Sequence, residues 1–150
     1  MKRLTALLCA LVLSLLCACG GQSAQPFTPA AVNTLLESEV FSEPLEPLDM
    51  EIACFLYQLD GEQANLTDLQ AHRSAGATYE EVAVLTFKSE ADASAALTTM
   101  QSYLAARLAD CKSYMPDQVP KLEHATLTQR ANTILLVIAD DWTAAAELVK

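Results

Sequence analysis

Two apolar runs decide the fold: EVAVLTF at residues 81–87 and TILLVIA at residues 133–139. Each run places apolar side chains at consecutive positions, which is typical of a strand covered on both faces. We therefore predict that these runs are the central strands of one sheet. Alternating segments at 67–73 and 123–129 precede them, so each is predicted to pair with the apolar run that follows it as a hairpin.

Helical spacing of apolar residues flanks these strands. Thr28 and Pro29 are typical first residues of a helix, which Glu43-Pro44 would end. Residues 49–59 also carry apolar residues at helical spacing, which predicts a second, shorter helix; a strand is the alternative for this segment. A last helix would begin at Asp140-Asp141 and run to the end of the chain.

The longest predicted helix begins at Ser89, whose side chain can cap it together with Asp92. It must end before Pro116. Its apolar stripe consists of Leu97, Met100, Leu104, Leu108 and Cys111. The element order is then α-α-β-β-α-β-β-α. It predicts an α+β domain with a four-stranded antiparallel sheet, the long helix on one face and the N- and C-terminal helices on part of the other.

The N-terminal segment is typical of a secretory signal. Lys2 and Arg3 precede an uncharged apolar run at 4–16, which is too short to span a membrane. The sequence Leu16-Cys17-Ala18-Cys19-Gly20 then resembles the bacterial lipobox. This resemblance implies cleavage between Ala18 and Cys19 and a diacylglycerol on the Cys19 sulfur. The alternative is an ordinary secretory signal in which Cys19 is incidental.

Three regions follow from this interpretation: a lipoprotein signal peptide at 1–18, the lipidated cysteine and a flexible tether at 19–27, and a single domain at 28–150. The polar, glycine-containing start of the tether is typical of a flexible linker. Two acyl chains on Cys19 are sufficient for stable anchoring. We therefore expect a lipid-anchored protein on the extracytoplasmic side of the cell membrane.

Charge excludes one class of partner. The 150 residues include 9 Lys and Arg against 19 Asp and Glu, a net charge of −10. Removal of residues 1–18 would leave seven basic against 19 acidic residues, a net charge of −12. This balance repels phosphate backbones, so we expect no nucleic-acid partner.

Cysteine content leaves one question open. After processing, Cys54 and Cys111 would remain as a pair in a compartment that permits disulfides. They could form a disulfide, or they could be buried free thiols that pack as small hydrophobic groups. Their spacing supports neither a metal site nor a dithiol redox site.

No catalytic, cofactor or metal motif is present in the sequence. His72 and His124 are predicted to be exposed on edge strands. Asp140-Asp141 and Glu80-Glu81 fit a helix cap and a solvated strand start better than calcium ligands. We therefore expect no enzyme activity and no cofactor.

Three stretches resemble a known family. These are Ser74 to Val84 (SAGATYEEVAV), Tyr114-Met115-Pro116 and Asn132 to Ile138 (NTILLVI). They are similar to segments of small Gram-positive lipoproteins that carry a single domain of unknown function. The resemblance implies a shared fold and brings no catalytic residues with it.

These observations favour a membrane-anchored, non-catalytic module that interacts with another protein of the cell envelope. The alternative is an accessory lipoprotein of an uptake system that binds a small molecule or a peptide. Free strand edges at 67–73 or 123–129 could also pair between two copies of the chain.

Overall fold

The computed structural model describes residues 25–61 and 65–150. The predicted signal peptide, the Ala18–Cys19 cleavage site and the lipidation of Cys19 lie outside the described residues. In chain order the described elements are α2 (Pro29–Glu37), β1 (Glu46–Leu48), α3 (Met50–Leu56), β2 (Leu66–Arg73), β3 (Glu81–Phe87), α4 (Glu90–Tyr114), the 3-10 turn η2 (Pro116–Gln118), α5 (Val119–Glu123), β4 (Thr126–Arg130), β5 (Thr133–Ile138) and α6 (Trp142–Leu148).

The described strands form one antiparallel sheet in the order β1-β2-β3-β5-β4. The two apolar runs, β3 and β5, are neighbours in its interior, as their composition predicts. Both expected hairpins are present. The prediction of four strands is wrong, because β1 adds a fifth strand beside β2, with Pro47 opposite His72. This strand has three residues, too few for an alternating pattern, and Pro47 fits there because β1 is an edge strand.

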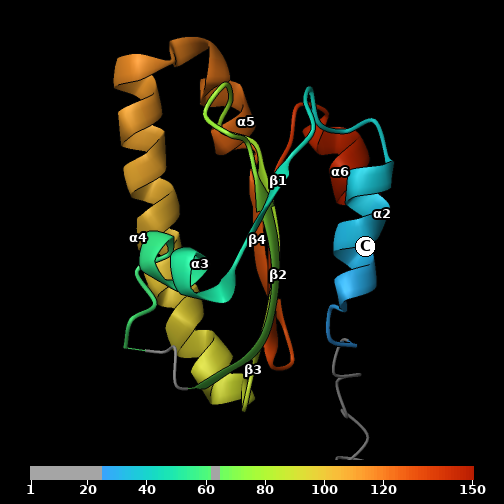
Figure 1. Cartoon of the computed structure of the whole chain (residues 1–150), viewed down its shortest axis with the longest axis vertical. Helices are drawn as coiled ribbons and strands as arrows, with labels where there is room; N and C mark the ends of the chain where they lie inside the picture. Colours follow the sequence, from blue (N-terminus) through green and yellow to red (C-terminus); the bar gives the residue numbers. More distant parts are fainter. Residues whose placement is uncertain (1–24, 62–64) are drawn as a thin grey trace, which may run out of the picture.

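Helices cover both faces of the sheet (Figure 1): α3 and α4 lie on one face, and α2 and α6 lie on the other. Consecutive residues of β3 therefore enter different cores. Ala83, Leu85 and Phe87 pack in the cluster under α3 and α4. Val82 and Val84 pack in the cluster under α2 and α6. This arrangement explains why the central strands need apolar residues at successive positions.

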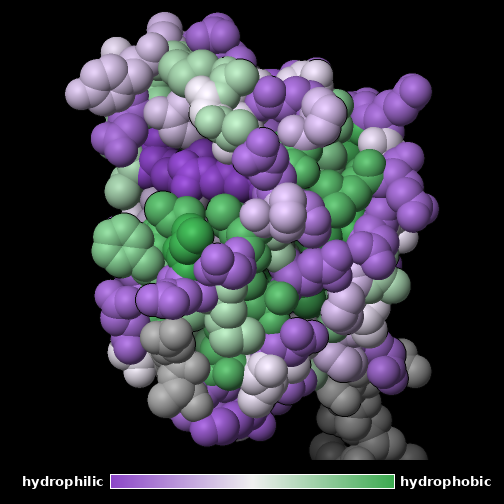
Figure 2. All heavy atoms as spheres, viewed as in Figure 1, coloured by the Kyte–Doolittle hydropathy of each residue, from purple (hydrophilic) through white to green (hydrophobic). Residues whose placement is uncertain are grey.

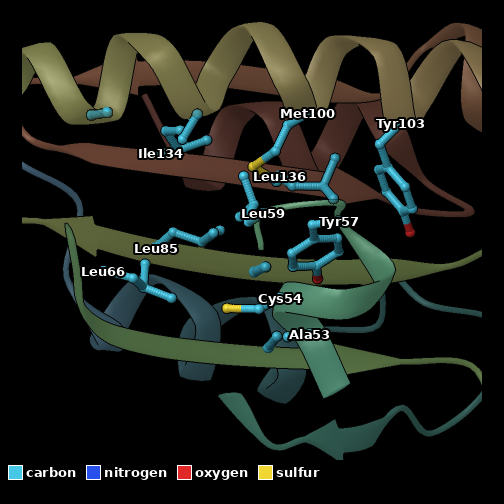
Figure 3. Close-up of a cluster of buried hydrophobic side chains, with 14 of the residues drawn as sticks. Ala53, Cys54, Tyr57, Leu59, Leu66, Leu85, Met100, Tyr103, Ile134 and Leu136 are labelled. Atoms are coloured by element: carbon cyan, nitrogen blue, oxygen red, sulfur yellow. The ribbon is translucent and has the colours of Figure 1, made fainter. Parts of the chain in front are cut away.

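Helix α4 begins where its capping sequence predicts, because the Ser89 side chain accepts a hydrogen bond from the backbone of Asp92. Its buried face differs slightly from the predicted stripe. The fully covered row is Ala93, Ala96, Met100, Tyr103, Arg107 and Cys111, with the leucines half-buried beside it. Figure 3 shows Met100 and Tyr103 extending from α4 toward the sheet and α3. The small alanines let α4 approach the sheet closely, which moves the longer leucines to the margin.

Other boundaries differ from the prediction for local reasons. The first helix ends at Glu37, and residues 38–45 form an irregular connection instead of its last turn. Residues 50–56 are helical, which decides between the two alternatives for that segment. The strand expected at 123–129 begins at Thr126, because the short helix α5 occupies the preceding residues.

The C-terminal helix and the start of the domain complete the second layer. Asp141 caps α6 by accepting a hydrogen bond from Ala144, as expected. Phe27, the last residue of the predicted tether, is buried, and its backbone donates to Thr133. No helix in the described part of the chain is both long and apolar enough to cross a membrane.

Candidate functional site

Two adjacent carboxylates at the start of β3 are completely buried. Sequence analysis predicts Glu80 and Glu81 as a solvated strand start, and the structure shows that this is wrong. The physical reason is that neighbouring residues of a strand point to opposite faces, and helices or loops cover both faces here. Each carboxylate meets a cation from a different helix, because a buried charge needs a partner.

Glu80 joins three segments that are distant in sequence. Its carboxylate accepts hydrogen bonds from Lys121 Nζ of α5 at 2.6 Å and from the Ser42 backbone at 2.9 Å. Lys121 also pairs with Asp140 at 2.7 Å. Burial alone would lower the pKa of Lys121, but its hydrogen bonds to Asp140 and Glu80 outweigh burial, so the pKa is raised. These contacts hold the connection after α2 against α5 and the end of β5.

Glu81 faces α4 on the other side of the sheet. The Tyr103 hydroxyl donates to Glu81 Oε2 at 2.8 Å, and Arg107 lies 3.7 Å from the same oxygen. Burial, and next the Glu81 charge, raise the pKa of Tyr103. The same two causes raise the pKa of Tyr57, whose ring packs edge-on against Tyr103. Both hydroxyls therefore remain protonated at neutral pH and can serve as donors.

Arg107 is held in one orientation by its neighbours. Its guanidinium lies over the rings of Tyr79 and Tyr103, at 4.8 and 5.6 Å from their centroids. It also donates to the backbone carbonyl of Tyr79 at 3.1 Å. Such contacts fix both the position and the plane of the cation.

Among the described residues of this cluster, Glu81 Oε1 and Arg107 Nε are buried polar atoms without a hydrogen-bond partner, whereas an interaction of the Tyr57 hydroxyl with Glu81 contributes to the raised pKa of Tyr57. A buried polar atom without a partner costs free energy, so a group of them indicates either an ordered water or a ligand position. Arg107 connects this cluster to a surface pocket.

The pocket, which we call the arginine pocket, has a volume of about 270 Å³. Its lining residues are Arg73, Gly76, Thr78, Tyr79, Arg107, Asp110 and Met115. Arg73 lies at the end of β2, between Glu46 of β1 and Glu81 of β3 in the sheet, and its side chain makes no hydrogen bond and joins no ion pair with any described residue. The pocket is therefore lined by an arginine whose side chain has no hydrogen-bond or ion-pair partner among the described residues, in a chain of net charge −10.

A second pocket adjoins the first. It has a volume of about 310 Å³ and is lined mainly by apolar or small residues, among them Pro47, Leu48 and Leu56, with Glu46 and Arg73 as its charged residues. Arg73 and Gly76 line both pockets. Gly76 has a φ of +120°, which residues with a side chain rarely adopt, so the turn between β2 and β3 depends on this glycine. We call this cavity the apolar pocket.

Helix α3 presents an apolar surface beside these pockets. Met50, Ile52 and Phe55 are 38, 49 and 72% exposed, whereas Ala53 and Cys54 on its other side are buried. We call these three exposed residues the α3 surface. Figure 2 shows an apolar area over α3 that is bordered by strongly hydrophilic side chains. An exposed apolar cluster of this kind is typical of a binding surface.

Cys54 and Cys111 are both buried free thiols in the core under α4. This state corresponds to the alternative in which they pack as small hydrophobic groups. Burial raises the pKa of both thiols, which leaves little reactive thiolate.

Neither histidine lines the arginine pocket, and each differs in part from its prediction. His72 is half-buried, because β1 covers the edge of β2, and burial lowers its pKa. His124 is exposed as expected, but it follows α5 instead of lying in a strand. Its ring stacks on the ring of Trp142, with the two centroids 4.6 Å apart. Within residues 25–61 and 65–150, no group of three or more His, Cys, Asp or Glu side chains could hold a metal ion.

Neither Arg73 nor Arg107 is predicted from the sequence to belong to a site. Arg107 lies seven residues after Met100 and four before Cys111, so helical spacing places it on the buried face of α4. A charged residue at such a position indicates a buried ion pair, and this signal was available from the sequence. Arg73 approaches Arg107 only through the sheet topology, which a single sequence does not reveal.

The fold and the site define a class: a small mixed α/β domain with an antiparallel sheet and a surface arginine pocket. The chain matches the family described as "Domain of unknown function (DUF4358)" over residues 55–139. This match covers more than half of the chain, so the chain belongs to that family. It includes both arginines and both buried glutamates. Comparison with curated proteins and with solved structures gives no match.

Proposed function

We propose that the chain is a lipoprotein, anchored in the cell membrane through Cys19 and facing the extracytoplasmic side, whose domain is a non-catalytic module that binds another envelope protein. The anchor is supported by the Leu16-Cys17-Ala18-Cys19 sequence after an apolar run. Phe27, eight residues after Cys19, is already packed in the core. A tether this short keeps the domain close to the membrane.

The α3 surface is the observation that supports protein binding. Phe55 is 72% exposed, on a helix whose other side is buried. Exposure of an aromatic ring to water is unfavourable, and burial of this ring against a partner would be favourable. Exposed aromatic side chains are frequent anchors of protein interfaces. The net charge of −12 expected after processing disfavours contact with an anionic membrane surface, so a protein partner suits this apolar surface better than the bilayer.

A second candidate function is binding of a small molecule or a peptide, as an accessory of an uptake system. The adjoining arginine and apolar pockets favour it. Ligand pockets usually have volumes of about 300–1,000 Å³. Neither pocket is large, but they share Arg73 and Gly76, so one ligand could extend across both.

The test is chemical cross-linking of the protein in its own membrane, followed by identification of the attached proteins. We expect one reproducible envelope partner, and we expect it to be lost in the secreted Cys19→Ala form. The Phe55→Asp variant should lose the same partner while keeping its fold, because substitutions at exposed positions cost within about 0.5 kcal/mol. Leu148→Asp is the matched control, since Leu148 is an exposed apolar residue on α6, across the sheet from α3.

Each result has a separate meaning. If the partner remains with Phe55→Asp, the α3 surface is not the binding surface. If it remains with Cys19→Ala, binding does not depend on the anchor. Recovery of abundant membrane proteins alone, equally from all variants, would contradict the interaction module. The anchor itself is tested by metabolic labelling with a fatty-acid analogue, which should label the native chain and not Cys19→Ala.

A further inference from the structure

We propose that the arginine pocket and the apolar pocket together bind a carboxylate that bears an apolar substituent. Two sources have this chemistry: the C-terminus of a peptide that ends in an apolar residue, and a free aliphatic acid. The inference deepens the second candidate function, ligand binding, and rests on it. It requires neither the lipid anchor nor the α3 surface.

Arg73 provides the charge that recognises the ligand. Arg73 lines both pockets, and its side chain has no hydrogen-bond or ion-pair partner among the described residues. A guanidinium presents parallel N–H donors that match the two oxygens of a carboxylate. The other cations near the cluster, Arg107 and Lys121, already have carboxylate partners.

Arg107 forms the fixed wall of the arginine pocket. It is only 7% exposed, and its Nε is buried without a hydrogen-bond partner. The Tyr79 carbonyl and the rings of Tyr79 and Tyr103 hold the guanidinium in place. Because these contacts exist without a ligand, binding would not have to order this side chain, and preorganisation of this kind favours affinity.

The charges around the pocket favour a single negative charge on the ligand. Glu81 already offsets the charge of Arg107, and Asp110 lines the same pocket. Glu46 lines the apolar pocket and lies opposite Arg73 in the register of β1 and β2. Arg73 is therefore the cation available to a ligand, and one carboxylate matches it. A dianion such as phosphate would bring a second charge close to Asp110, in a chain that is strongly acidic overall.

The apolar pocket gives the reason for the substituent. Pro47, Leu48 and Leu56 line it, and it continues from the arginine pocket at Arg73 and Gly76. A carboxylate paired with Arg73 would therefore place its apolar group against these residues. Burial of that group away from water adds to affinity roughly in proportion to its apolar area.

The test is calorimetric titration of the full chain in a non-ionic detergent with five probes: N-acetyl-leucine, N-acetyl-leucinamide, N-acetylglycine, 4-methylpentanoate and inorganic phosphate. We expect N-acetyl-leucine to bind. The amide, which lacks the carboxylate, and N-acetylglycine, which lacks the apolar group, should each bind at least about tenfold more weakly. Phosphate should give no saturable heat. A peptide source is indicated if N-acetyl-leucine binds more tightly than 4-methylpentanoate, and a free acid if that order is reversed.

Two variants assign the binding to the pocket. Arg73→Gln should weaken the binding of N-acetyl-leucine by about tenfold or more without unfolding the domain, because the Arg73 side chain makes no hydrogen bond within it. Lys112→Gln is the control: it removes an exposed cation from α4, outside both pockets, and should leave the affinity unchanged.

Two kinds of failure are distinguishable. Equal binding of N-acetyl-leucine and its amide, or equal weakening by Arg73→Gln and Lys112→Gln, would overturn the carboxylate site and leave ligand binding as such in place. No binding of any organic probe at about 10 mM would overturn the inference together with the second candidate function. Neither result affects the cross-linking test of the α3 surface.

Discussion

Replacement of Lys121 by methionine should strongly destabilise the domain. Lys121 and Glu80 are both buried, and their charged atoms lie 2.6 Å apart. Without the ammonium group, the Glu80 carboxylate stays buried with only the donors of Ser42. Removal of one partner from a buried ion pair typically costs about 3–5 kcal/mol. That is a large fraction of the roughly 5–15 kcal/mol that stabilise a domain of this kind.

The assay is urea unfolding at neutral pH, with Lys112→Met as the matched control. Lys112 also pairs with a glutamate, at 3.7 Å, but the side chains of Lys112 and Glu123 are 55 and 51% exposed. Exposed pairs contribute about 0–1 kcal/mol, so the control should unfold almost as the native protein does. Addition of Glu80→Gln to Lys121→Met should recover part of the loss, because a neutral amide can still accept from Ser42.

Equal destabilisation by Lys121→Met and Lys112→Met would refute this reasoning. It would mean that the Glu80 side chain is not buried as described, or that it finds solvent after the substitution. A double variant as unstable as Lys121→Met alone would indicate that lost packing of the lysine stem, and not the unpaired charge, dominates the cost.

Three further predictions concern the core and the pH dependence of stability. Cys54 and Cys111 are buried free thiols, so Ellman's reagent should react with neither in the native protein and with both after unfolding without reductant. If the two formed a disulfide, they would stay unreactive after unfolding. Hydrogen bonds from the Ser74 and Thr78 hydroxyls lower the pKa of Glu43. The charged Glu43 side chain therefore stabilises the domain above about pH 4.5, and this stabilisation is lost as the pH falls through the pKa of Glu43 in the folded state. The difference in melting temperature between the native protein and Glu43→Gln should therefore disappear in acid. A difference that stays constant as the pH is lowered would contradict this prediction. Leu136→Ala should cost about 2–5 kcal/mol in urea unfolding, and Leu148→Ala less than about 0.5 kcal/mol, since only Leu136 is fully buried.

The central part of the fold was predictable from sequence because apolar patterning reports burial directly. The runs at 81–87 and 133–139 are the neighbouring interior strands, and the Ser89 cap marks the start of the long helix. Strand β1 was not predictable in this way. Its three residues include a proline, and its pairing with β2 depends on contacts that are distant in sequence.

The candidate site was much less predictable, because patterning treats charged residues as exposed. Glu80 and Glu81 can be buried because each pairs with a cation, Lys121 or Arg107. Both cations lie on helices that follow later in the chain, so the sequence around the glutamates does not reveal them. The arginine pocket likewise forms where β2, the turn after it and α4 meet. Spacing along one sequence cannot show such a meeting, although a charge on the buried face of α4 was a usable signal.

The central claim is that an anchored domain binds an envelope protein through the α3 surface. The most direct measurement places a photoreactive amino acid at position 55 or 148 of the native chain and irradiates intact cells. We predict one abundant adduct from position 55, absent from position 148 and lost in Cys19→Ala, which would lack the proposed anchor. Identical adducts from both positions, or none from position 55 under conditions in which 148 reacts, would contradict the account.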